Sequence, residues 1–131
     1  MTQRAFSASP YERLYGFCRA IRVGDRIEVS GTAPIPQDGS AVPASAFEQM
    51  VLCGDIAVAA LTGLGATVTD VVRTRMFITS AADQEEIGRA HRQVFGDASP
   101  AATMVVVAGL LDPSWKVEIE VEAQIAGETP R

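Results

Sequence analysis

Residues 116–125 read Lys-Val-Glu-Ile-Glu-Val-Glu-Ala-Gln-Ile and alternate without a break between polar and apolar side chains. A period of two places all the apolar side chains on one face of a β-strand. The polar face then carries Glu118, Glu120 and Glu122, and three like charges on one strand face repel one another unless cations lie between them. The stretch therefore predicts a strand with one buried face, next to a strand that carries arginine.

The segment 71–79 predicts such an arginine-bearing strand. Arg73 and Arg75 lie on one of its faces, together with Val71 and Phe77. The other face is predicted to carry Val72, Thr74, Met76 and Ile78. Further strands are predicted at 15–22, 26–31 and 103–108, the first two joined as a hairpin by the turn Gly24-Asp25.

Two helices are predicted between these strands. Ser45 followed by Glu48 is the capping pattern that begins a helix, expected to end near residue 64. Asp83 with Glu86 begins a second helix, expected to end at residue 95. The apolar stripe of the first helix is predicted to contain Phe47, Val51, Ile56, Val58, Ala60, Leu61 and Leu64.

The element order is therefore ββαβαββ, which predicts an α+β domain with both helices on one face of a mixed sheet. We expect a single domain over 1–131, with a loose or partner-bound arm at 1–13 and a frayed tail at 126–131. The bare sheet face carries charged and apolar side chains together, which suits an interface between identical subunits.

The composition argues against several classes of function. The chain has 131 residues, 47% of them apolar, and a net charge of −5. An acidic chain is a poor partner for the phosphate backbone of nucleic acid or for an anionic membrane surface. No apolar run approaches the ~20 residues of a membrane span, and no apolar run follows Arg4 as in a secretory signal. Two cysteines without a CxxC pattern predict a reduced, cytoplasmic protein.

Few residues suit metal or nucleophilic chemistry. His91 is the only histidine, and no Walker loop or GxGxxG motif is present, so we expect neither a metal nor a nucleotide cofactor. His91 is either an exposed helix residue or a general base. Cys18 and Cys53 are interpreted as small buried apolar side chains.

Two other features have an ordinary and a functional interpretation. The glutamate ladder is either a salt-bridged sheet face or the source of one carboxylate that orients water in a pocket. Gly31, between Ser30 and Thr32, either ends a strand or lets a ligand approach the backbone closely. The residue patterns alone leave both alternatives open.

Several motifs resemble the Rid family (RidA/YjgF, also labelled endoribonuclease L-PSP). The matching stretches are Val23-Gly24-Asp25, Ser30-Gly31-Thr32-Ala33-Pro34, Leu64-Gly65-Ala66, Asp70-Val71-Val72-Arg73-Thr74, Ser99-Pro100-Ala101 and Val117-Glu118-Ile119-Glu120. The resemblance implies a chorismate-mutase-like α+β fold and a homotrimer with a barrel-like core and three clefts between subunits. It also implies a small-molecule substrate and no cofactor, since the RidA branch converts 2-aminoacrylate-type enamines and imines to 2-keto acids and ammonia.

The resemblance also implies site residues. Gly31 and the catalytic acid position, Glu118, are kept, with Thr32 beside them as a substrate-binding hydroxyl. Where the RidA branch has a pocket tyrosine this chain has Phe17. The branch's carboxylate-binding arginine is replaced by Ala102, and its small thiol by Met104.

A substitute cation is available. Arg19 shares a face of the predicted first strand with Phe17, so it is the better candidate, and Arg75 is the other. Arg19 has an equally good alternative as an ion-pair partner of the glutamate ladder. Losing a bidentate arginine contact costs orders of magnitude in rate, so simple imino acids are not the expected substrates.

The first hypothesis is a Rid-type enzyme that hydrolyses or tautomerises an imine, enamine or related metabolite, with Glu118 positioning water or moving a proton. The alternative is a non-catalytic ligand-binding or regulatory trimer that uses the same cleft. Ribonuclease activity fits poorly, because the chain is acidic and its sole histidine has no evident partner.

Overall fold

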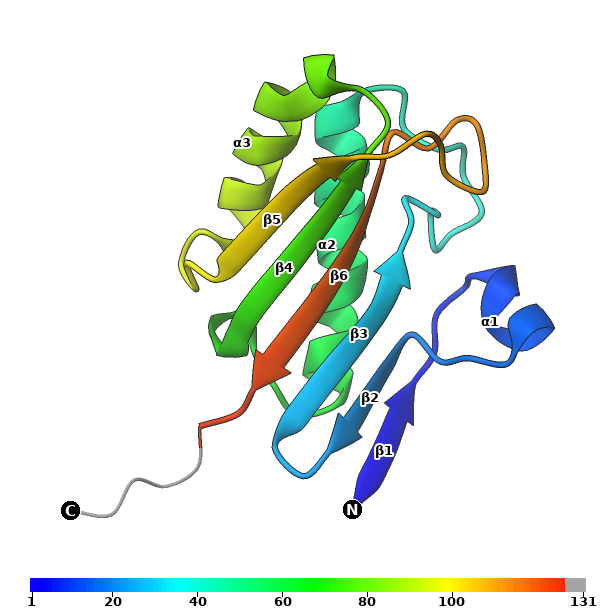
Figure 1. Ribbon diagram of the computed structural model, residues 1–131. Coiled ribbons are helices and arrows are strands. Elements are labelled where there is room, and N and C mark those ends of the chain that lie inside the picture. Colours follow the sequence, from blue (N-terminus) through cyan, green and yellow to red (C-terminus); the bar gives the residue numbers. More distant parts are fainter. Residues whose placement is uncertain (127–131) are drawn as a thin grey trace.

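One six-stranded sheet carries two long helices on one face (Figure 1). The computed structural model describes residues 1–126. The strand order is β1-β2-β3-β6-β4-β5, in which β4 and β5 pair in parallel and the other neighbours are antiparallel. The elements in chain order are β1 (Thr2–Ala5), α1 (Pro10–Tyr15), β2 (Ala20–Val23), β3 (Arg26–Thr32), α2 (Ala46–Gly63), β4 (Val71–Ile78), α3 (Gln84–Phe95), β5 (Ala101–Val106) and β6 (Val117–Gln124). The predicted α+β class, with two helices on one face of a mixed sheet, is confirmed.

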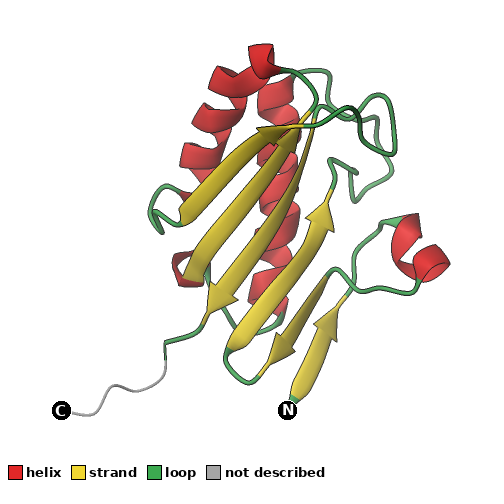
Figure 2. Ribbon diagram, viewed as in Figure 1, coloured by secondary structure: helices red, strands yellow, loops and turns green. Residues whose placement is uncertain are grey.

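The strand β6 lies in the middle of the sheet, as its alternation requires. Its apolar side chains are at most 1% exposed and pack under α2. The buried face of α2 carries Met50, Cys53, Ala57 and Leu61, which recur at helical spacing. The core therefore lies between the sheet and the two helices, and Figure 2 shows both helices on the same side.

The opposite sheet face carries the charge ladder that the sequence predicts. Arg73 lies opposite Glu122 and Arg75 opposite Glu120 across the β4–β6 pair. Arg75 Nη1 donates to Glu122 Oε2 at 2.5 Å, and this hydrogen bond holds the pKa of Glu122 below its usual value. Arg26 binds the same carboxylate from β3. The expected interleaving of arginine and glutamate is confirmed.

The N-terminal segment differs from the sequence prediction. Residues 2–5 are not a loose arm, because they pair with β2 from Thr2↔Val23 to Ala5↔Ala20. The predicted strand 15–22 is also wrong at its start, since Tyr15 ends a helix and β2 begins at Ala20. The order gains a strand and a helix before the predicted ββαβαββ.

The reason lies in local backbone preferences. The Ser9 side chain accepts a hydrogen bond from Tyr11 N, and Pro10 occupies the first turn, as is typical of a helix N-terminus. Gly16 then ends α1 with φ 77°, a left-handed conformation that glycine adopts without strain. These helix signals outweigh the weak alternation of the residues that follow.

Three finer predictions need correction. A β-bulge between Val71 and Arg73 turns Val72 outward, so it is 42% exposed and Val71 is buried instead. Three members of the predicted α2 stripe, Phe47, Val51 and Val58, are only partly buried beside the core. Asp83 precedes α3 but makes no capping hydrogen bond with its side chain. Ser45, in contrast, caps α2 by accepting from Glu48 N.

The helix α2 has 18 residues and is long and apolar enough to span a membrane by length and composition alone. In this fold half of it is buried in the protein, where it forms the core helix against the sheet.

Gly54 sets how closely α2 and α3 approach. A Cβ at Gly54 would lie 2.9 Å from Val94 Cγ1, whereas a Cβ at Gly88 on α3 would meet nothing within 4 Å. Replacing a helical glycine by alanine gains up to about 1 kcal/mol, but overpacking costs roughly 1–3 kcal/mol. We expect Gly54→Ala to lower the free energy of unfolding by about 1 kcal/mol and Gly88→Ala to raise it by about 0.5–1 kcal/mol, measured by urea denaturation. Equal gains in both variants would show that the helices are not in tight contact.

Candidate functional site

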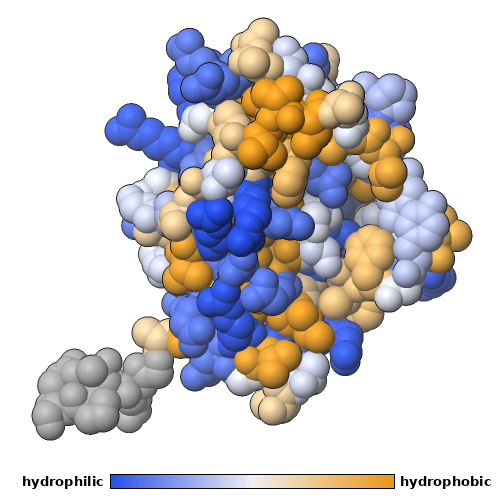
Figure 3. Space-filling view, in the orientation of Figure 1, coloured by the Kyte–Doolittle hydropathy of each residue, from blue (hydrophilic) through white to orange (hydrophobic). Residues whose placement is uncertain are grey.

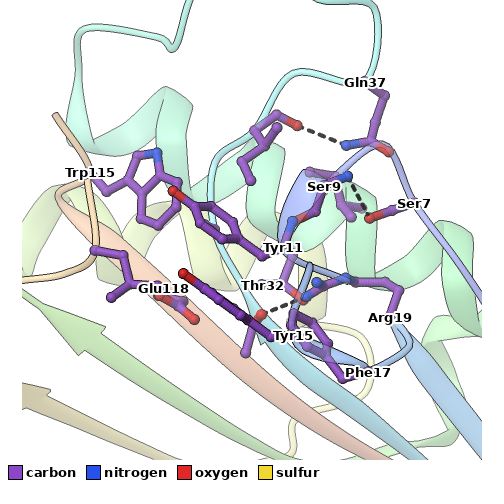
Figure 4. A pocket seen from close by; sticks show the side chains of 15 residues that line it. Ser7, Ser9, Tyr11, Tyr15, Phe17, Arg19, Thr32, Gln37, Trp115 and Glu118 are labelled. Atoms are coloured by element: carbon purple, nitrogen blue, oxygen red, sulfur yellow. Dashed lines mark hydrogen bonds between the residues drawn. The ribbon is translucent and has the colours of Figure 1, made fainter. Parts of the chain in front are cut away.

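A pocket lies between α1, the end of β3, β6 and the two loops that follow β3 and β5 (Figure 4). It holds a cavity of about 80 Å³ and opens to solvent. Its lining is Ser7, Ser9, Tyr11, Tyr15, Phe17, Arg19, Gly31, Thr32, Ala33, Ile35, Gln37, Ile56, Leu111, Trp115 and Glu118. Five of the predicted site residues, drawn from distant parts of the chain, therefore meet in one place.

The carboxylate of Glu118 lies directly against the backbone at Gly31. A Cβ at Gly31 would be 2.5 Å from Glu118 Oε2, so only glycine leaves room for the carboxylate there. Burial raises the pKa of Glu118, while the nearby positive charge of Arg19 lowers it and Glu120 raises it further. A raised pKa makes the carboxylate a stronger base, which suits a group that accepts and returns a proton.

Arg19 is held by a buried ion pair. Its Nε donates to Glu12 Oε2 at 3.0 Å, and both side chains are only 4% exposed. Glu12 lies on α1 and also binds the Ser7 backbone N at 2.9 Å and the Ser7 hydroxyl. The pair therefore fastens α1 to the sheet beside the pocket, a role that the sequence did not predict for Glu12. The alternative in which Arg19 pairs with the glutamate ladder is wrong.

The other contacts of Arg19 lie on the end of β3. Its Nη1 donates to the Gly31 carbonyl at 2.5 Å and to Thr32 Oγ1 at 3.1 Å. Its guanidinium carbon lies 5.5 Å from the centre of the Phe17 ring, a cation–π distance. Arg19 thus organises the polar wall of the pocket, and the Gly31 carbonyl is already engaged by a protein donor.

Aromatic rings form the opposite wall. Tyr11 and Tyr15 stack with ring centres 5.7 Å apart, and the Tyr11 ring meets Trp115 edge-on at 6.0 Å. Sequence reasoning missed all three residues. The signals that would have found the tyrosines are Ser9-Pro10 and Gly16, which delimit α1 and place Tyr11 and Tyr15 one turn apart.

Comparison with known proteins identifies the family. The family model described as Endoribonuclease L-PSP matches residues 8–125. An uncharacterized protein of Streptomyces coelicolor, SCO2049, is 36% identical over 92% of this chain and 90% of its own length. The chain belongs to the endoribonuclease L-PSP family.

Solved structures of this family have the same fold. Rv2704 of Mycobacterium tuberculosis, described as a member of the YjgF/YER057c/UK114 family, superposes with a TM-score of 0.85 at 34% identity, over 95% of this chain and all of that one. E. coli TdcF, solved with bound serine, superposes with a TM-score of 0.79 at 27% identity, over 96% and 97% of the two chains. The Rid/YjgF resemblance of the sequence is therefore confirmed.

Not all predicted site residues meet in one chain of this L-PSP family protein. Ala102 and Met104 lie on β5, which β4 and β6 separate from Gly31 on β3. Neither residue lines the pocket beside Glu118. Arg75 binds Glu122 on the bare sheet face, so of the two candidate cations only Arg19 reaches the pocket.

The remaining candidates lie outside the pocket. His91 Nε2 is 2.8 Å from Thr74 Oγ1 in the layer between α3 and the sheet, and burial lowers the pKa of its imidazole. Cys53 is fully buried, which raises the pKa of its thiol, whereas Cys18 is only half-buried. Within residues 1–126 no three His, Cys, Asp or Glu side chains cluster as a metal site would need.

The first prediction from this site concerns the buried ion pair. Glu12→Gln leaves the Arg19 guanidinium buried without its hydrogen-bonded carboxylate, which costs about 3–5 kcal/mol of unfolding free energy. Glu28→Gln is the matched control, because it removes the carboxylate of an exposed ion pair. Arg26 Nε donates to Glu28 Oε2 at 2.9 Å, and the side chains of Arg26 and Glu28 are 41% and 53% exposed, respectively. An exposed pair contributes less than about 1 kcal/mol. The free energy of unfolding is measured by urea denaturation. Similar losses of this free energy in the two variants would contradict the structural role of Glu12.

The second prediction concerns the charge of Glu118. A carboxyl group whose folded pKa is raised favours folding below its unfolded pKa, and this contribution is lost as the pH rises through the raised value. Glu118→Gln should therefore be more stable than the native protein at pH 7, with the difference closing once the pH falls below the ordinary value of 4.5. Thermal unfolding at pH 7 and pH 4 measures this. A native protein as stable as the variant at pH 7 would show that burial does not penalise the Glu118 charge.

Proposed function

We propose that this family member hydrolyses an imine or enamine without a cofactor, on a substrate other than a simple imino acid. The observation that supports this most is the Glu118 carboxyl, half-buried in a pocket and held against Gly31. The structure of TdcF with bound serine supports a small-molecule site in the family. The cytoplasmic location predicted from the sequence remains a prediction.

In the proposed reaction Glu118 orients a water molecule toward the imine carbon. The water oxygen bonds to that carbon as the Glu118 carboxylate accepts one water proton, and the C=N π electron pair moves to nitrogen, which takes this proton from Glu118 to give a carbinolamine. Glu118 then accepts the proton of the new hydroxyl group and gives it to the nitrogen, so that the C=O bond forms as the C–N bond breaks. The products are a carbonyl compound and ammonia, so the atoms balance with water as the only co-reactant.

We also propose that the working unit is a homotrimer in which the pocket lies between subunits. The bare sheet face supports this, because it exposes Val105 by 41% beside the charge ladder. Figure 3 shows apolar patches bordering hydrophilic ones on this face. Light scattering in solution measures the number of chains.

The proposed chemistry predicts the effect of Glu118→Gln on imine hydrolysis. General acid–base catalysis contributes roughly 10²–10⁴-fold, so we expect the variant to lose at least 100-fold in rate. Imines are generated in situ by an amine or amino-acid oxidase, and ammonia release is compared with the uncatalysed background. Glu120→Gln is the matched control, because Glu120 lies two residues along β6, is 44% exposed and is not part of the pocket lining.

Two outcomes would contradict the proposal. Equal losses in both variants would mean that the carboxyl in the pocket has no special role. If the native protein accelerates no imine yet binds small molecules, the ligand-binding alternative is the better description.

A further inference from the structure

We propose that the substrate carries a flat aromatic substituent and no carboxylate group. This inference rests on the proposed function and names the class of imine that the same pocket takes. Two features of the pocket support it. The first is the aromatic wall. The second is that Arg19, the one arginine in the pocket lining, is already bound by other groups of the protein.

The aromatic wall is larger than the core needs. Trp115 is only 5% exposed and already packs against the edge of Tyr11, but the outer ring, Tyr15, is 68% exposed. In Figure 4 the rings of Tyr11 and Tyr15 lie across the pocket between Trp115 and the Arg19 side chain. In the single chain, the Tyr15 ring stacked on Tyr11 thus presents a π-face at the pocket mouth, where another flat ring can stack.

The charges of the pocket disfavour a carboxylate. The Arg19 guanidinium is paired with Glu12 and donates to Gly31 and Thr32, so its hydrogen bonds and its charge are already used by the protein's own groups. Glu118 adds an acidic group to the same pocket. A substrate carboxylate would therefore meet a pocket whose lining, within residues 1–126, offers no cation other than the paired Arg19. Desolvating an unpaired carboxylate is costly, whereas an uncharged imine or its protonated form is not repelled.

The cavity is too small to enclose an aromatic ring, which places the ring at the pocket mouth. The cavity of about 80 Å³ is smaller than the roughly 150 Å³ cavity that encloses benzene in another protein. A phenyl group must therefore stay partly outside, against Tyr15, while its short side arm reaches the Glu118 carboxyl. An arylalkyl imine of the form ArCH₂CH=NH has this shape, and its hydrolysis with one water gives ArCH₂CHO and ammonia.

The inference is tested by binding of unreactive mimics, measured by calorimetry on the native protein. Phenylacetamide carries the ring and a neutral planar head, phenylacetate replaces the head by a carboxylate of the same shape, and acetamide lacks the ring. We expect phenylacetamide to bind at least tenfold more tightly than either of the others. Trp115 is the only tryptophan of the chain and lines this pocket, so quenching of its fluorescence reports whether the ligand lies there. Equal affinity for phenylacetate, or no binding of phenylacetamide at millimolar concentration, would overturn the inference.

Variants of Tyr15 test the role of the exposed ring. Tyr15→Ala should weaken phenylacetamide binding at least fivefold and leave acetamide binding unchanged, while Tyr15→Phe keeps the ring and the affinity. Leu14→Ala is the matched control, because Leu14 is the neighbour on α1, is 70% exposed and is not part of the pocket lining. Unchanged affinity in Tyr15→Ala, or an equal loss in Leu14→Ala, would show that this ring does not select the ligand.

Imine hydrolysis separates this inference from the proposed function. The imine of 2-phenylethylamine, made by a flavin amine oxidase, should be hydrolysed at least tenfold faster than 2-iminopropanoate made from alanine. Faster hydrolysis of 2-iminopropanoate would overturn the inference and leave the proposed function standing. Binding in the expected order without hydrolysis of any imine would overturn the proposed function and support the inference about recognition.

Discussion

The buried ion pair between Glu12 and Arg19 is the contact on which the candidate site depends. Arg19 reaches from the segment before β2 to the carbonyl of Gly31 and the hydroxyl of Thr32, and Glu12 holds its other edge. Because Glu12 lies on α1, the same pair keeps the short helix and its two tyrosines beside the sheet. A six-residue helix is too short to be stable alone, so its position comes from this tertiary contact.

The arrangement explains how one pocket combines an acidic group with an apolar wall. Gly31 leaves space for the Glu118 carboxyl at the β-bulge between Val29 and Thr32, where the regular pairing of β3 with β6 is interrupted. The carboxyl is thereby taken partly out of water, which raises its pKa.

Much of the fold could be predicted because its patterns are local and strong. The alternation of β6, the capping serine of α2 and the arginines of β4 each identify an element without reference to the rest of the chain. The N-terminal segment could not be predicted in this way. Strand β1 is an edge strand of four residues with almost no buried side chain, so it leaves no hydrophobic pattern, and α1 is shorter than two turns. Val72 is misplaced for a related reason, since a β-bulge shifts the alternation by one residue.

The sequence by itself determined the α+β class, the buried face of β6, the charge ladder and the family. The resemblance to the Rid family also singled out Glu118, Gly31, Thr32 and Phe17, and Arg19 was chosen because its spacing from Phe17 places both on one face of the predicted first strand. Only the tertiary structure decided that Arg19 pairs with Glu12, that Tyr11, Tyr15 and Trp115 form the second wall, and that Ala102 and Met104 lie on a distant strand. The physical reason is that these relations join segments up to about a hundred residues apart, through side-chain contacts that periodicity and local propensity do not encode.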